Sequence, residues 1–346
     1  MFRKDKFLGR NDILDILKKR LDGFLNGYRQ NIAIVGAESI GKTWLVKYFL
    51  DSIKDTKVIA IYIDMTQPDI ETIINKFIAS LIFGYFKNNN ITVEPSDNIN
   101  SLIETSRNYI PQTFEKINSI RADIQKQKFN KIFKGCLEIL EIYSCEAQVQ
   151  SLIVIDEFQQ LQRFNIKDAF KELGKRIMLE HDIMYIFTSS KTNVAKDILS
   201  KELALLFGNF EIIDLAPFDI NISREFIQQR VTIEDTDSLY KDFIIYLTGG
   251  NPFYLEVILK ELNNLIQTKQ IDIFTSSLLI KALTHILFYS DGIINHKFTA
   301  YLNQIINRSK DNPLPVLICI SQGLNKIKDI PAFIHKTKKE TLILLS

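Results

Sequence analysis

The chain has 346 residues and a formal net charge of +2, so its overall charge gives no general attraction to nucleic acids or membranes. Apolar residues make up 46% and charged residues 24%, the usage of a globular protein long enough for two or three domains. No uncharged apolar run reaches the roughly 18 residues that a membrane helix needs, and the N-terminal segment lacks the apolar stretch of a signal peptide. The widely spaced Cys136, Cys145 and Cys319 predict buried free thiols in a reducing, cytoplasmic compartment.

Short continuous apolar runs in residues 1–216 predict a parallel α/β sheet. Apolar residues at helical spacing predict helices at 12–25 and 44–53. Strands are expected at five runs, which are 32–35, 58–63, 152–155, 183–187 and 210–215.

A long segment, 69–150, separates the second and third expected strands. It predicts a helix at 70–83, a polar break at 87–100 and further helices within 112–145. Two interpretations are open: an all-helical insertion in the crossover of the sheet, or a dedicated surface for a partner.

From Pro217 onward the pattern predicts an almost wholly helical chain. The expected helices are 223–231, 237–247, 253–267, 276–288 and 295–307, followed by three short ones within 313–346. From Lys297 to the end, eight Lys or Arg residues against three Asp or Glu residues give a local charge of +5.

The strongest motif is GAESIGKT, which spans Gly36 to Thr43 and has the pattern GxxxxGK[ST] between an expected strand and an expected helix. Gly36 and Gly41 permit backbone turns that a β-carbon would block, so the amides of the loop can converge on phosphates. Lys42 is placed to reach the β- and γ-phosphates of ATP, or the β-phosphate of ADP, and Thr43 offers its hydroxyl to Mg²⁺. The expected nucleotide-binding residues of this segment are Gly36, Ala37, Glu38, Ser39, Ile40, Gly41, Lys42, Thr43 and Trp44.

Two acids follow the buried run LIVI and predict the second half of the site. Asp156 is expected to hold Mg²⁺, since a buried pair of acids is costly without a cation. Glu157 is expected to polarise the attacking water. The alternative is that both acids only cap the following helix.

The segment FTSS ends another expected strand at Ser190. A hydroxyl there, from Thr188 or Ser190, is a candidate to contact the γ-phosphate or the attacking water, and the alternative is ordinary turn chemistry. The sequence does not choose between the two hydroxyls.

The ordered set FLGRND, GAESIGKT, LIVIDEFQ, FTSS, LAPF and GGNPFYL resembles the archaeal-type ATPases of the AAA+/STAND superfamily, relatives of the origin-recognition and NB-ARC ATPases. The resemblance covers roughly residues 5–265. It implies that the FLGR box helps to wall the adenine pocket and that the GGNP turn of a helical lid touches the nucleotide. It also implies that the strand ending in FTSS lies between the P-loop strand and the strand of Asp156. The box residues expected at the adenine are Phe7, Leu8, Gly9 and Arg10, and the turn residues expected at the nucleotide are Gly250, Asn251 and Pro252.

The expected fold is therefore an α/β P-loop NTPase sheet with a helical insertion, an all-α lid and a small C-terminal helical domain. The expected boundaries are 1–216 for the nucleotide-binding domain (insertion 69–150), 217–290 for the lid and 291–346 for the last domain. A winged helix often follows the lid in this family, but the chain ends after the apolar run 342–345 without room for a β-wing. The last domain is at best a reduced winged helix.

One departure from the family bears on catalysis. Relatives commonly carry LFGR before the last strand, with an arginine that acts on the γ-phosphate, whereas this chain has Asn209 at that position. Asparagine does not supply that positive charge. Arg224, Arg230 or an arginine from another subunit are the candidates to replace it, and otherwise hydrolysis is expected to be slow.

Three functions remain open from the sequence. The leading one is an ATP-hydrolysing molecular switch that couples its nucleotide state to binding of a protein partner, with self-association as a further option. The second is an ATP-clamped scaffold with little turnover, which Asn209 motivates. The third is a DNA-transaction ATPase, which the basic C-terminal segment motivates but the near-neutral overall charge does not favour.

Overall fold

The computed structural model describes residues 8–54, 57–92, 98–203, 210–233, 237–270, 273–308, 312–324 and 326–345. The chain divides into two compact units, which we describe separately. The first comprises Met1–Ile222 together with Asn251–Phe253, and the second comprises Ser223–Gly250 and Tyr254–Ser346. The expected division into three domains, with its boundaries, stays a prediction.

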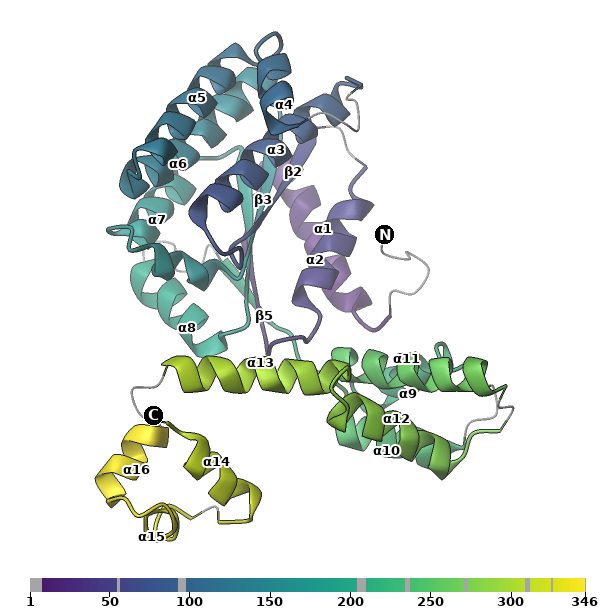
Figure 1. The fold of residues 1–346 in the computed structure, drawn as a ribbon. Coiled ribbons are helices and arrows are strands. Elements are labelled where there is room, and N and C mark those ends of the chain that lie inside the picture. The colour runs from purple at the N-terminus through teal and green to yellow at the C-terminus, as the bar shows by residue number, and fades with distance from the viewer. Residues whose placement is uncertain are drawn as a thin grey trace. The chain divides into compact units, whose positions relative to one another are not determined.

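The first unit is built on a five-stranded parallel sheet with the order β2-β3-β4-β1-β5 (Figure 1). The strands are β1 (Asn31–Val35), β2 (Val58–Asp64), β3 (Gln150–Asp156), β4 (Ile183–Ser189) and β5 (Phe210–Asp214). All five expected strands are therefore present. Strand β4, which carries FTSS, lies between β1 and β3, as the resemblance implied.

Helices cover both faces of this sheet, because successive side chains of a strand point to opposite faces (Figure 1). Leu152 and Val154 of β3 pack in the cluster that includes α1 (Asn11–Leu25) and α2 (Lys42–Ser52). Ile153, between them, packs in the cluster on the opposite face, where the inserted helices lie. Both faces are thus buried, which explains why the strands are continuous apolar runs.

The described residues of the segment between β2 and β3 form helices joined by short connections and no strand, in agreement with the insertion expected from the sequence. Its helices are α3 (Ile70–Asn88), α4 (Ile99–Ser106), α5 (Pro111–Gln125) and α6 (Phe129–Ala147). Helix α3 runs five residues beyond its expected end, because its last turns bury Phe86 in the core. The remaining helical elements of this unit are η2 (Phe158–Phe164), α7 (Ala169–Leu179), α8 (Thr192–Asp197) and η3 (Ile198–Glu202).

The described residues of the second unit contain helices and no strand. Helix α9 (Ile220–Gln228) leads into it, and α10 (Ser238–Thr248), α11 (Pro252–Lys269), α12 (Ser276–Phe288) and α13 (Ile293–Arg308) follow. These match the expected helices to within two residues at each end, except that α9 begins and ends three residues earlier. The three short helices expected at the C-terminus are α14 (Leu314–Ser321), α15 (Ile330–Phe333) and α16 (Lys338–Leu345), which enclose a small core of Val316, Cys319 and Ile330.

One stretch, Ser276–Ile306, is long and apolar enough by length and composition to cross a membrane. It consists of two helices, α12 and α13, which a turn at 289–292 separates. Leu278 and Ala282 of α12 are buried within the protein. The stretch is therefore weak evidence for a membrane span.

The cysteines differ from the expectation in their exposure. All three are free thiols, but only Cys319 is buried, whereas Cys136 is half-buried and Cys145 is exposed. Both of the latter lie on α6, and Cys145 occupies its solvent face. The expectation of three buried thiols is wrong because spacing along the chain does not reveal which helix face a cysteine occupies.

Candidate nucleotide-binding site

The GAESIGKT loop connects the end of β1 to the start of α2 and approaches other backbone closely. A Cβ atom on Gly36 would lie 2.6 Å from the carbonyl oxygen of Leu215, so no side chain fits there. Ser39 and Gly41 both have left-handed backbone conformations, with φ of 62° and 98°. Such turns before a helix N-terminus point backbone amides toward a common anion site.

Lys42 is the first residue of α2, and its side chain is buried, with 4% exposure. Its ammonium donates hydrogen bonds to the carbonyl oxygens of Gly36, at 3.0 Å, and Ala37, at 2.9 Å. Burial lowers the pKa of this ammonium, while the neighbouring carboxylates of Glu157 and Asp156 oppose that shift. Backbone carbonyl groups of the loop thus bind the ammonium of its own lysine.

Asp156 ends β3 and gathers three hydroxyl donors from three separate elements. Thr43 donates to its Oδ2 at 2.8 Å, Tyr62 of β2 donates to the same oxygen, and Thr188 of β4 donates to Oδ1. Burial, and then the bond to Asp156, raise the pKa of the Tyr62 hydroxyl. The expected metal-binding pair, Thr43 and Asp156, is therefore in direct contact.

Glu157 follows in a left-handed conformation, with φ of 54°. Its Oε2 accepts hydrogen bonds from the backbone N–H of Ser190 at 2.9 Å, from the Ser190 hydroxyl at 2.6 Å and from the Gln159 amide at 2.6 Å. Its Oε1 lies 3.8 Å from the Lys42 ammonium. The two candidate hydroxyls of FTSS thus donate to different carboxylates, Thr188 to Asp156 and Ser190 to Glu157. The Thr188 oxygen also accepts a hydrogen bond from the backbone N–H of Glu157 at 3.1 Å.

The FLGR box packs against the LAPF segment, about 200 residues away in sequence. Arg10 is buried, donates a hydrogen bond to the carbonyl of Ala216 at 2.5 Å and stacks over the Phe218 ring at 4.7 Å. Gly9 has φ of 78°, and a Cβ atom there would lie 2.4 Å from a methyl carbon of Ile222. Leu8 is half-buried, and Phe7 lies outside the described residues. No described contact joins the box to the phosphate loop itself, so its role at the adenine stays a prediction.

The GGNP turn ends α10 and begins α11. Gly249 and Gly250 both have positive φ, and the Asn251 side chain accepts a hydrogen bond from the Phe253 amide at 3.0 Å. A Cβ atom on Gly41 would lie 3.9 Å from Cγ of Pro252, so this proline borders the phosphate loop. Pro252 and Asn251 belong to the first unit, whereas Gly250 belongs to the second.

Both arginines considered as substitutes for the missing arginine already have partners in the second unit. Arg224 forms two hydrogen bonds of 2.9 Å with Asp242. Arg230 contacts Glu256 at 3.1 Å and lies over the Phe226 ring. Asn209 and the preceding Leu206–Gly208 lie outside the described residues.

Two side chains of the site were missed by sequence reasoning. Tyr62 interrupts an otherwise aliphatic strand run with a polar group, which is a detectable signal. Gln159 follows Glu157 by two residues and is 4% exposed, and its Oε1 has no hydrogen-bond partner among the described residues. A buried side-chain amide whose nitrogen alone is hydrogen-bonded is available to bind a further polar group through its oxygen.

These residues fit a nucleoside triphosphate and Mg²⁺. The loop offers amides and one buried cation to phosphates, and the Thr43 hydroxyl beside the Asp156 carboxylate offers the oxygen ligands that Mg²⁺ prefers. When bound there, the metal would neutralise charge on the phosphates. Glu157, held by Ser190 and Gln159, is the carboxylate available to accept a proton from water.

Comparison with known proteins agrees with this geometry. A model of an ATPase domain predominantly from Archaea matches residues 7–258. No curated protein matches the chain in sequence.

Solved structures match the chain at low sequence identity. The Aeropyrum pernix ORC1 protein in complex with DNA has a TM-score of 0.52 and 11% identity, covering 81% of this chain and 66% of that one. The chain therefore spans slightly less than two thirds of that protein. The Aeropyrum pernix ORC2 protein in ADPNP–ADP complexes has a TM-score of 0.48 and 13% identity, covering 98% and 85% of the two chains. The Thermotoga maritima RuvB branch migration motor has a TM-score of 0.47 and 12% identity, covering 96% and 84%.

Proposed function

Because the chain belongs to the family of ATPase domains found predominantly in Archaea, we propose that it is an ATP-hydrolysing switch whose nucleotide state controls binding of a protein partner. Lys42 and the loop amides bind the phosphates of ATP, Thr43 and Asp156 hold Mg²⁺, and Glu157 activates water. A cytoplasmic location and the kinship with STAND proteins belong to the same proposal.

The observation that carries the proposal is the position of Pro252 beside the phosphate loop. Pro252 borders Gly41 and is also the first residue of α11, an 18-residue helix that belongs to the second unit from Tyr254 onward. We expect a change in the loop to reach this helix through the covalent chain. In the proposed switch, the GGNP turn and α11 would form the element that responds to the nucleotide.

The contacts inside the site support two states of the loop. The Lys42 ammonium is bound to carbonyl oxygens of its own loop, and phosphate oxygens are stronger acceptors for it. ATP is expected to take over these bonds and to shift the neighbouring backbone of Gly36 and Ala37.

Hydrogen exchange measured by mass spectrometry tests the switch. We expect the Glu157→Gln variant with ATP and Mg²⁺ to protect the segment around Asn251–Phe253 more than the same variant with ADP. The matched control is Lys42→Met, which should show the same exchange with either nucleotide. Identical exchange with ATP and ADP in Glu157→Gln would contradict the switch.

A DNA-transaction ATPase is the second candidate. The match to an ORC1 protein solved in complex with DNA and the local charge of +5 from Lys297 to the end favour it. We then expect the affinity for duplex DNA to fall as the salt concentration rises from 50 to 200 mM, by a factor of about 10³ if six phosphates are contacted. Reversing Lys338 and Lys339 to Glu should abolish binding, whereas reversing Lys18 should not.

A slow scaffold is the third candidate, which Asn209 motivates. Without an arginine at this position we expect slow steady-state turnover, because an arginine finger is worth about 10³-fold or more in phosphoryl transfer. Turnover that rises with protein concentration would indicate that self-association supplies an arginine. Fast turnover at every concentration would contradict the scaffold.

A further inference from the structure

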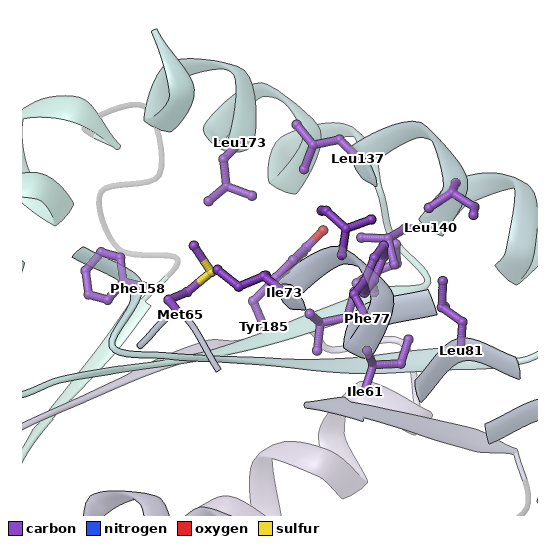
Figure 2. Close-up of a cluster of buried hydrophobic side chains, with 14 of the residues drawn as sticks. Ile61, Met65, Ile73, Phe77, Leu81, Leu137, Leu140, Phe158, Leu173 and Tyr185 are labelled. Carbon is purple, nitrogen blue, oxygen red and sulfur yellow. The ribbon is translucent and has the colours of Figure 1, made fainter. Parts of the chain in front are cut away.

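The first unit contains a cavity of about 90 Å³ between the sheet and the helices on its insertion face. Leu137 of α6 and Leu173 of α7 point toward Met65 and Ile73 across this region (Figure 2). Phe158 of η2, the residue after Glu157, also lines the cavity. Its lining side chains belong to the core cluster on the insertion face, opposite to the face that α1 and α2 cover.

The lining offers no polar surface to an occupant. The only hydroxyl among the lining side chains, that of Tyr185, donates a hydrogen bond to Glu180 at 2.9 Å. Burial raises the pKa of the Cys136 thiol to about 12, so this thiol is uncharged at neutral pH. Water inside would find no hydrogen-bond partners, and apolar cavities of this kind stay dry and accept apolar molecules.

Size and access limit what can enter. An engineered cavity of about 150 Å³, lined by Leu, Ile and Phe in another protein, binds benzene or xenon, and the cavity here is somewhat smaller. Phe133, Cys136 and Phe164 line it and are only half-buried, so it reaches toward solvent. Met65 lines the cavity with a flexible side chain, which can adjust its conformation to a bound molecule.

We propose that this cavity is a binding site for a small uncharged apolar molecule, no larger than one aromatic ring or a short branched hydrocarbon. The proposal follows from the dry lining, the volume and the half-buried rim. It does not depend on ATP hydrolysis.

Benzene is the probe, and the methyl groups of methionine are the reporters. The chain has four methionines: Met65 lines the cavity, whereas Met178 is exposed on α7. In NMR spectra of the full chain labelled with ¹³C at methionine methyls, we expect benzene to shift the Met65 signal saturably and to leave Met178 unchanged. Pyridine has nearly the same shape, but its ring nitrogen would find no hydrogen-bond donor among the lining residues. It should therefore bind at least about tenfold more weakly than benzene.

A matched pair of variants on α6 locates the binding. Cys136→Phe fills the cavity and should abolish the saturable Met65 shift, whereas Cys145→Phe adds the same ring at an exposed position and should leave it intact. Because overpacking destabilises cores, the smaller change Cys136→Leu is the second variant. It should lower the affinity for benzene at least severalfold. A wild-type Met65 signal without a saturable shift, parallel shifts at Met178, equal binding of pyridine, or benzene binding unchanged by Cys136→Phe would each overturn the proposal.

Discussion

The hydroxyl of Ser190 donates a hydrogen bond of 2.6 Å to Oε2 of Glu157, which joins the end of β4 to the residue after β3. The backbone N–H of Ser190 donates to the same oxygen. Gln159 completes the set of donors and leaves Oε1 of Glu157 facing the Lys42 ammonium at 3.8 Å. The direction in which this carboxylate points is therefore determined by its neighbours.

We expect Ser190→Ala to lower kcat of ATP hydrolysis about tenfold, because it removes one hydrogen bond to a charged group, worth about 1.5 kcal/mol. ATP affinity should stay near the wild-type value, since the phosphate loop is unchanged. Ser190→Thr keeps the hydroxyl and should restore most of the rate. Equal loss in the Ala and Thr variants would mean that Ser190 does not position Glu157.

Replacing Glu157 with Gln should stop turnover and preserve ATP binding. The amide keeps the shape of the side chain but does not accept a proton from water, and general bases contribute about 10² to 10⁴ in rate. Phosphate release measures the rate, and fluorescent-nucleotide titration measures the affinity. Glu71→Gln, an exposed acid in the first turn of α3, is the control. A variant that keeps most of the wild-type rate would show that another group activates the water.

Lys42→Ala should weaken ATP binding by roughly 30- to 150-fold, equivalent to about 2–3 kcal/mol for lost charged hydrogen bonds. Lys42→Met keeps the length of the side chain without its charge and should weaken binding to a similar extent. The only tryptophan, Trp44, adjoins Thr43 and is a fluorescent reporter beside the loop. Lys18→Ala is the control for an exposed lysine. Unchanged affinity in a folded Lys42 variant would contradict the assignment of the phosphate loop.

The strands and the acids that follow them could be predicted because both depend on local signals. A buried parallel strand is a continuous apolar run, and the sheet edge where it ends is where polar residues follow. The choice between Thr188 and Ser190 depended instead on the register of two neighbouring strands, in which Ile155 pairs with Phe187. That register places Thr188 beside Asp156 and leaves Ser190 to reach Glu157.

Contacts that span the chain could not be predicted from local patterns. Tyr62 reaches Asp156 because β2 pairs with β3, and no feature near Tyr62 in the sequence indicates that pairing. The contact of Arg10 with Ala216 joins residues 206 positions apart. The cavity arises from several helices and strands that meet in three dimensions, so it also has no sequence signal.

A buried acid outside the site predicts how stability depends on pH. Glu180 follows α7, and burial raises the pKa of its carboxyl from 4.5 to about 7, although the Tyr185 hydroxyl and the Arg176 guanidinium oppose the shift. Arg29 binds the backbone carbonyl of Glu180 rather than its carboxylate. The folded state therefore retains a proton that the unfolded chain has already released between these two pH values.

The free energy of unfolding should consequently fall as pH rises from about 4.5 to 7, by at most about 3 kcal/mol from this group. Glu180→Gln stays neutral and still accepts from Tyr185, so it should be more stable than wild type at pH 8 by up to that amount and gain little at pH 4.5. Urea unfolding followed by Trp44 fluorescence reports on the first unit, to which Trp44 belongs, and Glu71→Gln, an exposed acid of α3, is the control. An equal stability difference between Glu180→Gln and wild type at pH 4.5 and pH 8 would contradict a raised pKa for the Glu180 carboxyl in the folded protein.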